Sequence, residues 1–207
     1  MTIGFGIYAP AGFATDPAAL ARAAQKLRDL GHAVVVDDAA TARWQRFAGT
    51  DDERLAAIAR IAARDDVDVA LAVRGGYGWT RLIGRIDFGD LARRGKRWLG
   101  HSDFTAFQLA ALARAGLKSF AGPMAAYDFG AVAPSAFTLA HCLAVLEHPR
   151  HAFDCALDGP DLDATGTLWG GNLAMVASLC ATPYLPAIDG GILFLEDVAE
   201  HPYRIER

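Results

Sequence analysis

The chain has 207 residues, of which 53% are hydrophobic and 21% are charged. This length suits one large domain or a domain and a half, and the apolar content can bury a substantial core, which excludes disorder as the main state. Lys and Arg number 20 against 24 Asp and Glu, a net charge of −4. Without a strong basic field, nucleic acid is a poor choice of partner.

The cysteines and the N-terminus indicate the compartment. Cys142, Cys155 and Cys180 are odd in number and form no C-x-x-C pair, so neither a disulfide framework nor a zinc site is indicated. No positive residue precedes Arg22, and no run reaches the roughly 18 apolar residues of a membrane span. We expect a soluble, cytoplasmic protein without a metal or a cofactor.

Strand and helix patterns alternate along the chain. Ile3–Tyr8 is an apolar run typical of a buried strand, and a loop follows it. Asp16 and Pro17 mark the start of a helix, and Gly31 can take the left-handed position at its end. The other predicted strands are Ala33–Val36, Val67–Val73, Trp98–Gly100, Lys118–Ala121 and a buried Gly191–Leu195, and the other predicted helices begin at Asp51 and Pro202 or cover Asp103–Arg114, Ser135–Glu147 and Asn172–Cys180.

This alternation favours an α/β fold with a doubly wound, mostly parallel sheet and flanking helices. In such folds the sites lie beyond the carboxyl ends of the strands. His148–Asp163, rich in Pro, Asp and Gly, is predicted to be a long surface excursion. We therefore predict an N-terminal α/β domain over residues 1–165, and a linker with the beginning of a C-terminal domain over residues 166–207.

The first candidate site element is Arg74–Gly78, a glycine-rich loop directly after a predicted strand. Its glycines can take positive φ and present backbone N–H groups to an oxyanion or a carboxylate. A tight strand-to-helix turn would use the same residues, and the glycines alone do not separate the two interpretations.

The second candidate is Ser102, between a strand and a helix. Gly100 stands two residues before it, but Phe104 occupies the place of the second glycine in G-x-S-x-G. On a sharp turn at a helix N-terminus Ser102 would suit a nucleophile. Taken alone, an N-cap over Thr105 is the commoner role. His101 is excluded as its base, because adjacent side chains diverge on a turn.

The third candidate is the strand that ends at Glu196 and Asp197. A carboxylate there can orient a catalytic imidazole, and since Asp197 is the better helix cap, Glu196 is the residue that needs a partner. Residues 169–172, Trp-Gly-Gly-Asn, are predicted to form a glycine-bearing turn that opens a helix, and Asn172 is equally suited to an N-cap and to a ligand contact. Structural roles without metal-ligand spacing are predicted for His32, His141, His148, His151 and His201.

Several of these stretches can be compared together with known families. They are Tyr8–Gly12, Phe47–Leu55, Arg74–Gly78, Gly100–Thr105, Gly166–Leu173, Thr182–Tyr184 and Phe194–Asp197. In this order they resemble the LD-carboxypeptidase family, serine peptidases that include muramoyltetrapeptide carboxypeptidases and microcin C immunity proteins. The likeness covers essentially the whole chain, although the family often has His where Ala121 stands here.

The resemblance implies a metal-free Ser-His-Glu triad that hydrolyses the amide between an L-configured centre and a terminal D-amino acid. Ser102 would be the nucleophile, and Glu196 would orient the base. The backbone N–H groups of Gly76 and Asp103 would form the oxyanion hole. Residues that would contact the substrate are Arg74, Gly75, Tyr77 and Asn172.

The resemblance also implies a partner and a missing part. The substrate would be a muropeptide tetrapeptide that loses D-alanine, and the enzyme would be a homodimer without nucleic-acid or membrane partners. The family's histidine lies well downstream of Glu196, whereas this chain stops at Arg207. We expect an N-terminal portion whose own C-terminal segment supplies the histidine, and which is nearly inactive alone.

Two alternatives stay open. A microcin-C-type immunity peptidase would act on an aminoacyl nucleotide. A non-catalytic module would hold a small anion in the glycine loops, and Ser102 would then only cap a helix.

Overall fold

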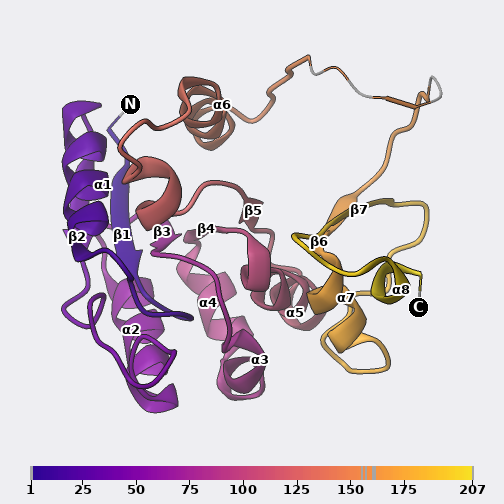
Figure 1. Ribbon diagram of the computed structural model, residues 1–207, viewed down its shortest axis with the longest axis horizontal. Coiled ribbons are helices and arrows are strands. Elements are labelled where there is room, and N and C mark those ends of the chain that lie inside the picture. The colour runs from indigo at the N-terminus through magenta and orange to yellow at the C-terminus, as the bar shows by residue number, and fades with distance from the viewer. Residues whose placement is uncertain (1, 155, 157, 160–161, 207) are drawn as a thin grey trace.

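The computed structural model describes residues 2–206 except 155, 157, 160 and 161. Its main feature is a five-stranded parallel sheet with the strand order β2-β1-β3-β4-β5 (Figure 1). The strands are β1 (Gly4–Tyr8), β2 (Ala33–Val36), β3 (Val69–Ala72), β4 (Arg97–Gly100) and β5 (Phe120–Ala121). The predicted doubly wound, mostly parallel α/β fold is confirmed.

Helices cover both faces of this sheet because strand side chains alternate between two hydrophobic clusters. Phe5 and Leu71 belong to the cluster under α1, α6 and the π-helical turn Ala125–Phe129. Tyr8 and Trp98 belong to the cluster under α2, α4, α5 and α7. The helices are α1 (Pro17–Asp29), α2 (Asp51–Ala63), α3 (Trp79–Leu82), α4 (Phe88–Arg94), α5 (Thr105–Ala115), α6 (Ala136–Glu147), α7 (Leu173–Leu179) and α8 (Pro202–Ile205).

Local capping explains where several helices begin and end. The Asp16 carboxylate accepts the Ala18 N–H at 2.9 Å at the start of α1, and Gly31 follows its end with a φ of 88°, as predicted. α2 begins at a capping box in which Thr50 and Glu53 bond to each other's backbone N–H groups. This T-x-x-E spacing is the sequence signature of a capping box.

Two segments differ from the sequence prediction. Residues 79–94, for which no element was predicted, form α3, a 3₁₀ turn and α4; α4 is capped by Asp87 and ended by Gly95 at a φ of 65°. β5 is shorter than the predicted Lys118–Ala121. The reason is the turn after α5, where the Leu117 N–H still donates to the Ala111 carbonyl at 3.2 Å.

A second, two-stranded parallel sheet pairs β6 (Leu168–Asn172) with β7 (Ile192–Glu196). The predicted turn at residues 169–172 is wrong, because Gly170 and Gly171 run in a strand with φ of 117° and 126°. A side chain is excluded there, since a Cβ on Gly170 would lie 2.0 Å from the Phe194 carbonyl oxygen. The predicted domain boundary at residue 165 falls between the two sheets and stays a prediction.

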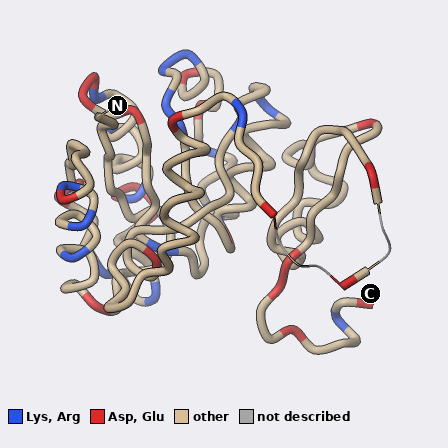
Figure 2. The backbone as a smooth tube through the Cα atoms, turned by 90° about the horizontal axis from the view of Figure 1, so that it is seen from above, with Lys and Arg blue, Asp and Glu red and all other residues tan. Residues whose placement is uncertain are grey.

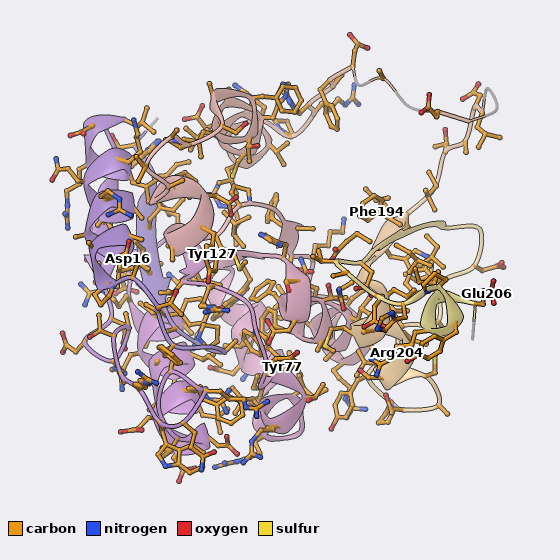
Figure 3. The ribbon with its side chains drawn as sticks, in the orientation of Figure 1. Asp16, Tyr77, Tyr127, Phe194, Arg204 and Glu206 are labelled. Atoms are coloured by element: carbon orange, nitrogen blue, oxygen red, sulfur yellow. The ribbon has the colours of Figure 1, made fainter. Side chains whose placement is uncertain are left out.

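The prediction that the last strand is buried is also wrong. Phe194 is 56% exposed and its neighbours in β7 are exposed as well, and Figure 3 shows it in the smaller sheet. An apolar run of this length fits a buried strand by composition, but only a second layer of structure would bury it.

The described residues between α6 and β6 are exposed, as predicted for His148–Asp163. They contain no helix or strand (Figure 1). Cys142 and Cys180 are free thiols, whereas Cys155 lies outside the described residues. In the described part of the chain, every helix is too short or too polar to cross a membrane.

An aromatic cluster supports the loop that follows β4. Phe107 is fully buried, and its ring centroid lies 4.8 Å from that of Trp79, 5.2 Å from that of Trp98 and 5.0 Å from that of Phe104. Phe104 is the second residue after Ser102, so this packing fixes the turn that carries the serine.

We predict that Phe107→Ala lowers the free energy of unfolding by about 3–5 kcal/mol, because it removes a buried ring and leaves a cavity. Phe137→Ala, at a ring that is 56% exposed, serves as control and should cost less than about 1 kcal/mol. Urea denaturation of both variants measures the difference. If both variants lost the same free energy of unfolding, the conclusion that Phe107 supports the Ser102 turn would be contradicted.

Candidate active site

The candidate site lies at the point where the strand order reverses. In a sheet with the order 2-1-3-4-5, the loops after the first and third strands diverge there and leave a crevice. Here the Gly12 N–H, after β1, donates to the Gly75 carbonyl at 3.2 Å, after β3. The two loops are therefore joined beside the carboxyl end of β4, from which Ser102 follows.

Ser102 adopts a strained backbone conformation, with a φ of 65°. A left-handed non-glycine residue costs about 1–2 kcal/mol, and such residues cluster at functional sites. Phe104 stands where G-x-S-x-G has its second glycine. Its ring packs against the first glycine, because a Cβ on Gly100 would lie only 2.8 Å from that ring.

The helix-cap alternative for Ser102 is wrong. α5 starts at Thr105 with Phe104 as N-cap and without a side-chain cap bond, and the 3₁₀ turn Ser102–Phe104 has none either. The Ser102 side chain is half-buried. Its hydroxyl makes no hydrogen bond to another described residue and can therefore act on a bound molecule.

The glycine loop, Arg74–Gly78, packs directly against the serine. A Cβ on Gly75 would lie 2.9 Å from the Ser102 Cβ and 3.0 Å from its Oγ. Gly76 has a φ of 120°, which favours glycine. Within the described residues, neither the Gly76 N–H nor the Asp103 N–H donates to a protein acceptor. Both donors can serve a ligand oxygen.

Glu196 reaches the same edge through the smaller sheet. It ends β7 opposite Asn172 of β6, and the Asn172 N–H donates to the Thr105 hydroxyl at 3.0 Å. The Asn172 carboxamide accepts the Met175 N–H at 3.2 Å, so of its two predicted roles the N-cap is the one observed. No hydrogen bond joins Glu196 to Ser102 among the described residues, and a third group would have to connect them.

Arg74 is held over the crevice. Its Nε donates to the Gly75 carbonyl at 3.1 Å and its Nη1 to the Phe13 carbonyl at 3.4 Å, and its guanidinium lies 5.1 Å from the Tyr127 ring centroid. Tyr77, at the other end of the glycine loop, is 65% exposed. Figure 3 labels both tyrosines on this part of the molecule.

Arg54 is a residue of the site that the sequence analysis missed. It is fully buried and donates to the Pro10 carbonyl at 2.8 Å, to the Gly78 carbonyl at 3.2 Å and to the Asp51 carboxylate. This one side chain thus joins the loops after β1 and β3. The sequence could have indicated this role, because Arg54 lies on the same helix face as the apolar Ile58 and Ile61. An arginine on a buried face needs partners, since arginine is almost never fully buried without them.

A second missed group lies on the π-helical turn. The Asp128 carboxylate accepts the Met124 N–H at 2.7 Å and lies 3.6 Å from Nε2 of His101. Burial opposes the charge of Asp128, but the hydrogen bonds from His101 and Met124 lower its pKa. His101 therefore faces Asp128, which agrees with its exclusion as a base for Ser102.

Asp103 carries an unusual carboxyl group beneath the candidate oxyanion hole. The residue is 4% exposed, and no donor in the described part of the chain makes a well-aligned hydrogen bond to either oxygen, although the Trp79 N–H lies near enough to lower the pKa. Burial raises its pKa to about 7, although the charges of Arg54, Arg74 and His101 act in the opposite direction. The carboxyl group therefore titrates near neutral pH.

A pocket of about 380 Å³ opens beside the glycine loop. It is lined by Asp103, by Tyr77 and Trp79, by Arg46, and by Met175 from α7, among others. The described residues hold no group of three or more His, Cys, Asp or Glu side chains arranged for a metal ion. A serine on a strained turn, next to backbone donors at the crevice of an α/β sheet, is typical of serine hydrolases.

Comparison with known proteins identifies the family. Residues 5–122 match the family described as LD-carboxypeptidase N-terminal domain, and residues 165–207 match the one described as LD-carboxypeptidase C-terminal domain. The chain belongs to the LD-carboxypeptidase family, as the sequence resemblance indicated.

Named relatives agree with this assignment. The chain is 33% identical to the probable murein peptide carboxypeptidase of Bacillus subtilis over 98% of its own length and 64% of the relative's. It is 34% identical to the murein tetrapeptide carboxypeptidase of Pseudomonas aeruginosa over 80% of its own length and 57% of the relative's. The chain thus spans under two thirds of these curated relatives.

Solved structures show the same fold. The muramoyltetrapeptide carboxypeptidase from Oxalobacter formigenes is 45% identical, with a TM-score of 0.89 over 98% of this chain and 68% of that one. MccF, solved with glutamyl sulfamoyl guanosine, has a TM-score of 0.87 over 99% of this chain and 71% of its own, at 20% identity. At that identity the likeness concerns the fold alone.

We predict that Gly75→Ala lowers the free energy of unfolding by about 1–3 kcal/mol, because the added methyl group displaces the Ser102 turn. Gly84→Ala is the matched control, since a Cβ there would meet its nearest atom at 3.4 Å. Urea denaturation measures the cost, and amide chemical-shift changes locate it. Unchanged shifts at residues 100–105 in Gly75→Ala would refute the contact.

The raised pKa of Asp103 predicts a pH-dependent stability. Between the unfolded value near 4 and the folded value of about 7, the folded state binds more protons, so its stability falls as pH rises through this window. Relative to the wild type, Asp103→Asn should gain up to about 4 kcal/mol between pH 4 and pH 7. Denaturant unfolding at each pH measures this gain.

Asp128→Asn is the control for this experiment, because the pKa of Asp128 is lowered rather than raised. It should gain nothing over the wild type in the same window. A constant difference between Asp103→Asn and the wild type across pH 4–7 would contradict the assignment.

Proposed function

We propose that this chain forms most of a cytoplasmic serine carboxypeptidase that releases D-alanine from muropeptide tetrapeptides during peptidoglycan recycling. The observation that carries the proposal is the geometry of Ser102. Its backbone is strained, its side chain caps no helix, and it packs against Gly75 beside the unbonded N–H groups of Gly76 and Asp103. The printed names of the relatives, murein peptide and murein tetrapeptide carboxypeptidase, support the substrate class.

The reaction would begin at the hydroxyl of Ser102. Its Oγ attacks the scissile carbonyl carbon while its proton passes to a histidine that Glu196 orients. The Gly76 and Asp103 N–H groups donate to the resulting oxyanion, and each such donor is worth about 3–4 kcal/mol in the transition state. The C–N bond then breaks, the departing D-alanine amine takes the proton, and water hydrolyses the acyl-serine.

We propose that the histidine comes from the part of the C-terminal domain that the longer relatives contain. Four of the six histidines of this chain are engaged elsewhere. His101 faces Asp128, the His32 ring accepts the Ile3 N–H at 3.3 Å, and His141 and His151 bond to each other at 2.6 Å. A homodimer is part of the same proposal.

Arg74 would bind the terminal carboxylate of the substrate. A guanidinium suits a carboxylate because it can donate two parallel hydrogen bonds. Arg74 lies over the glycine loop rather than in an ion pair within the described residues. Tyr77 and Asn172 would flank the peptide on either side of Ser102.

Two other functions compete with this one. In a non-catalytic anion-binding module, Ser102 would only cap α5, which its geometry does not support. An immunity peptidase would cleave an aminoacyl nucleotide, and the fold shared with MccF is compatible with it. Substrate choice separates the two peptidases.

The decisive experiment joins this chain to the remaining C-terminal part of the Oxalobacter formigenes carboxypeptidase. We expect the fusion to release D-alanine from an L-Ala-γ-D-Glu-meso-diaminopimelate-D-Ala peptide, because it contains every part of the proposed triad. A fluorophosphonate should label Ser102, and Ser102→Ala should abolish both reactions, with at least a 10³-fold loss of rate.

The fusion is also given aspartyl sulfamoyl adenosine, the ligand solved with MccF. Preference for this compound would favour the immunity peptidase. A folded fusion that neither labels nor hydrolyses either compound would favour the binding module, and activity that survives Ser102→Ala would refute the serine mechanism.

A further inference from the structure

Three arginines around the crevice have no carboxylate partner within the described residues, unlike Arg81 at the same pocket, which pairs with Asp51. Many arginines elsewhere in the described chain form ion pairs, for example Arg60 with Asp37 and Arg94 with Asp90. Arg43, Arg46 and Arg74 form none. We call these three residues the cation cluster. In a chain with a net charge of −4, unpaired positive charge at one place indicates an anionic ligand.

Phe13 joins the members of the cation cluster. Its ring lies 4.1 Å from the Arg43 guanidinium, and its N–H donates to the Arg46 carbonyl at 3.4 Å. Its own carbonyl accepts from Nη1 of Arg74 at 3.4 Å. The three arginines are thus held around one residue of the loop after β1, beside the glycine loop.

A tight turn presents Arg46 to the pocket beside Asp103. Trp44 and Phe47 exchange two backbone hydrogen bonds of 2.9 Å, and Gln45 between them has a φ of 54°. The Arg46 guanidinium lies 5.8 Å from the Tyr77 ring centroid, and both residues line the pocket of about 380 Å³. The turn therefore fixes the backbone of Arg46, and its exposed side chain reaches the pocket.

Other charges near this pocket leave Arg46 as the free cation among the described lining residues. Arg81 also lines the pocket, but its Nη2 donates to the Asp51 carboxylate at 2.7 Å. Asp103 is the lining carboxylate, and it is buried. Lys and Arg are absent from residues 151–203. Figure 2 accordingly shows Lys and Arg along the larger lobe that contains the N-terminus, whereas the smaller lobe shows blue only near the C-terminus.

We propose that this pocket is a second anion subsite, in which Arg46, supported by Arg43, binds a carboxylate of the substrate peptide away from the scissile bond. The inference rests on the proposed function, in which Arg74 binds the terminal carboxylate. Tyr77 and Met175, which line the pocket, can pack against peptide atoms around that carboxylate. The preferred substrate then carries two separate carboxylates.

Binding of two matched tetrapeptides tests this subsite. They share a C-terminal D-alanine and differ only at the second residue, γ-linked D-glutamate with a free α-carboxylate or the same residue as its carboxamide. Calorimetry with the Ser102→Ala form of the 207-residue chain measures binding without turnover. We expect the carboxylate peptide to bind about tenfold more tightly, and the difference to shrink as salt is added.

Substitutions assign the preference to the cation cluster. Arg46→Gln should bring the ratio of the two dissociation constants close to one, and Arg43→Gln should lower it partially. Arg114→Gln is the matched control. Arg114 is an exposed arginine near the opposite end of α5, roughly 14 Å along the helix from Thr105, and its substitution should leave the ratio unchanged.

Equal binding of the two peptides by the wild-type pocket, or a ratio that Arg46→Gln leaves intact, overturns the subsite, and so does the absence of binding by both.

The two proposals fail separately. A preference for the carboxylate peptide in a protein whose fusion does not hydrolyse it would keep the subsite and remove the peptidase. Hydrolysis of both peptides at equal efficiency would do the reverse. Tighter binding of the aminoacyl nucleotide than of either peptide overturns the assignment to a peptide carboxylate.

Discussion

The buried guanidinium of Arg54 is the interaction on which the rest of the site depends. A parallel sheet places loop ends side by side, but it leaves their conformations to local chemistry. Arg54 connects the carbonyls of Pro10 and Gly78, from the loops after β1 and β3, to the N-terminus of α2 through Asp51. A buried cation needs all these acceptors, so the loops and the helix hold one another in a single arrangement.

Backbone strain and tight packing occur together around Ser102. The left-handed serine would relax in a loose environment, since its conformation costs free energy. Close contact with Gly75 on one side, and the Phe104 and Phe107 rings on the other, keep the turn in place. The same packing leaves no room for a side chain at Gly75 or Gly100, which explains glycine there without reference to flexibility.

Charge is distributed differently at the site and away from it. Ion pairs such as those of Arg60 and Arg94 neutralise arginines on the helices, whereas the cation cluster around Phe13 keeps its charge for a ligand. The net charge of the whole chain does not reveal this arrangement. The buried Asp103 carboxyl adds a group that titrates near pH 7 next to the candidate oxyanion donors, so the local field changes over the pH range in which such an enzyme would work.

By itself the sequence determined the alternation of strands and helices, the cap at Asp16 and the turn that carries Ser102, because these depend on periodicity and on residues close together in the chain. It also contained motifs sufficient to indicate the family. Tertiary structure alone decided that Arg54 joins two loops, that β7 is exposed and that Gly170 and Gly171 lie in a strand. Burial and strand pairing depend on which distant segments meet, and local sequence patterns do not specify those contacts.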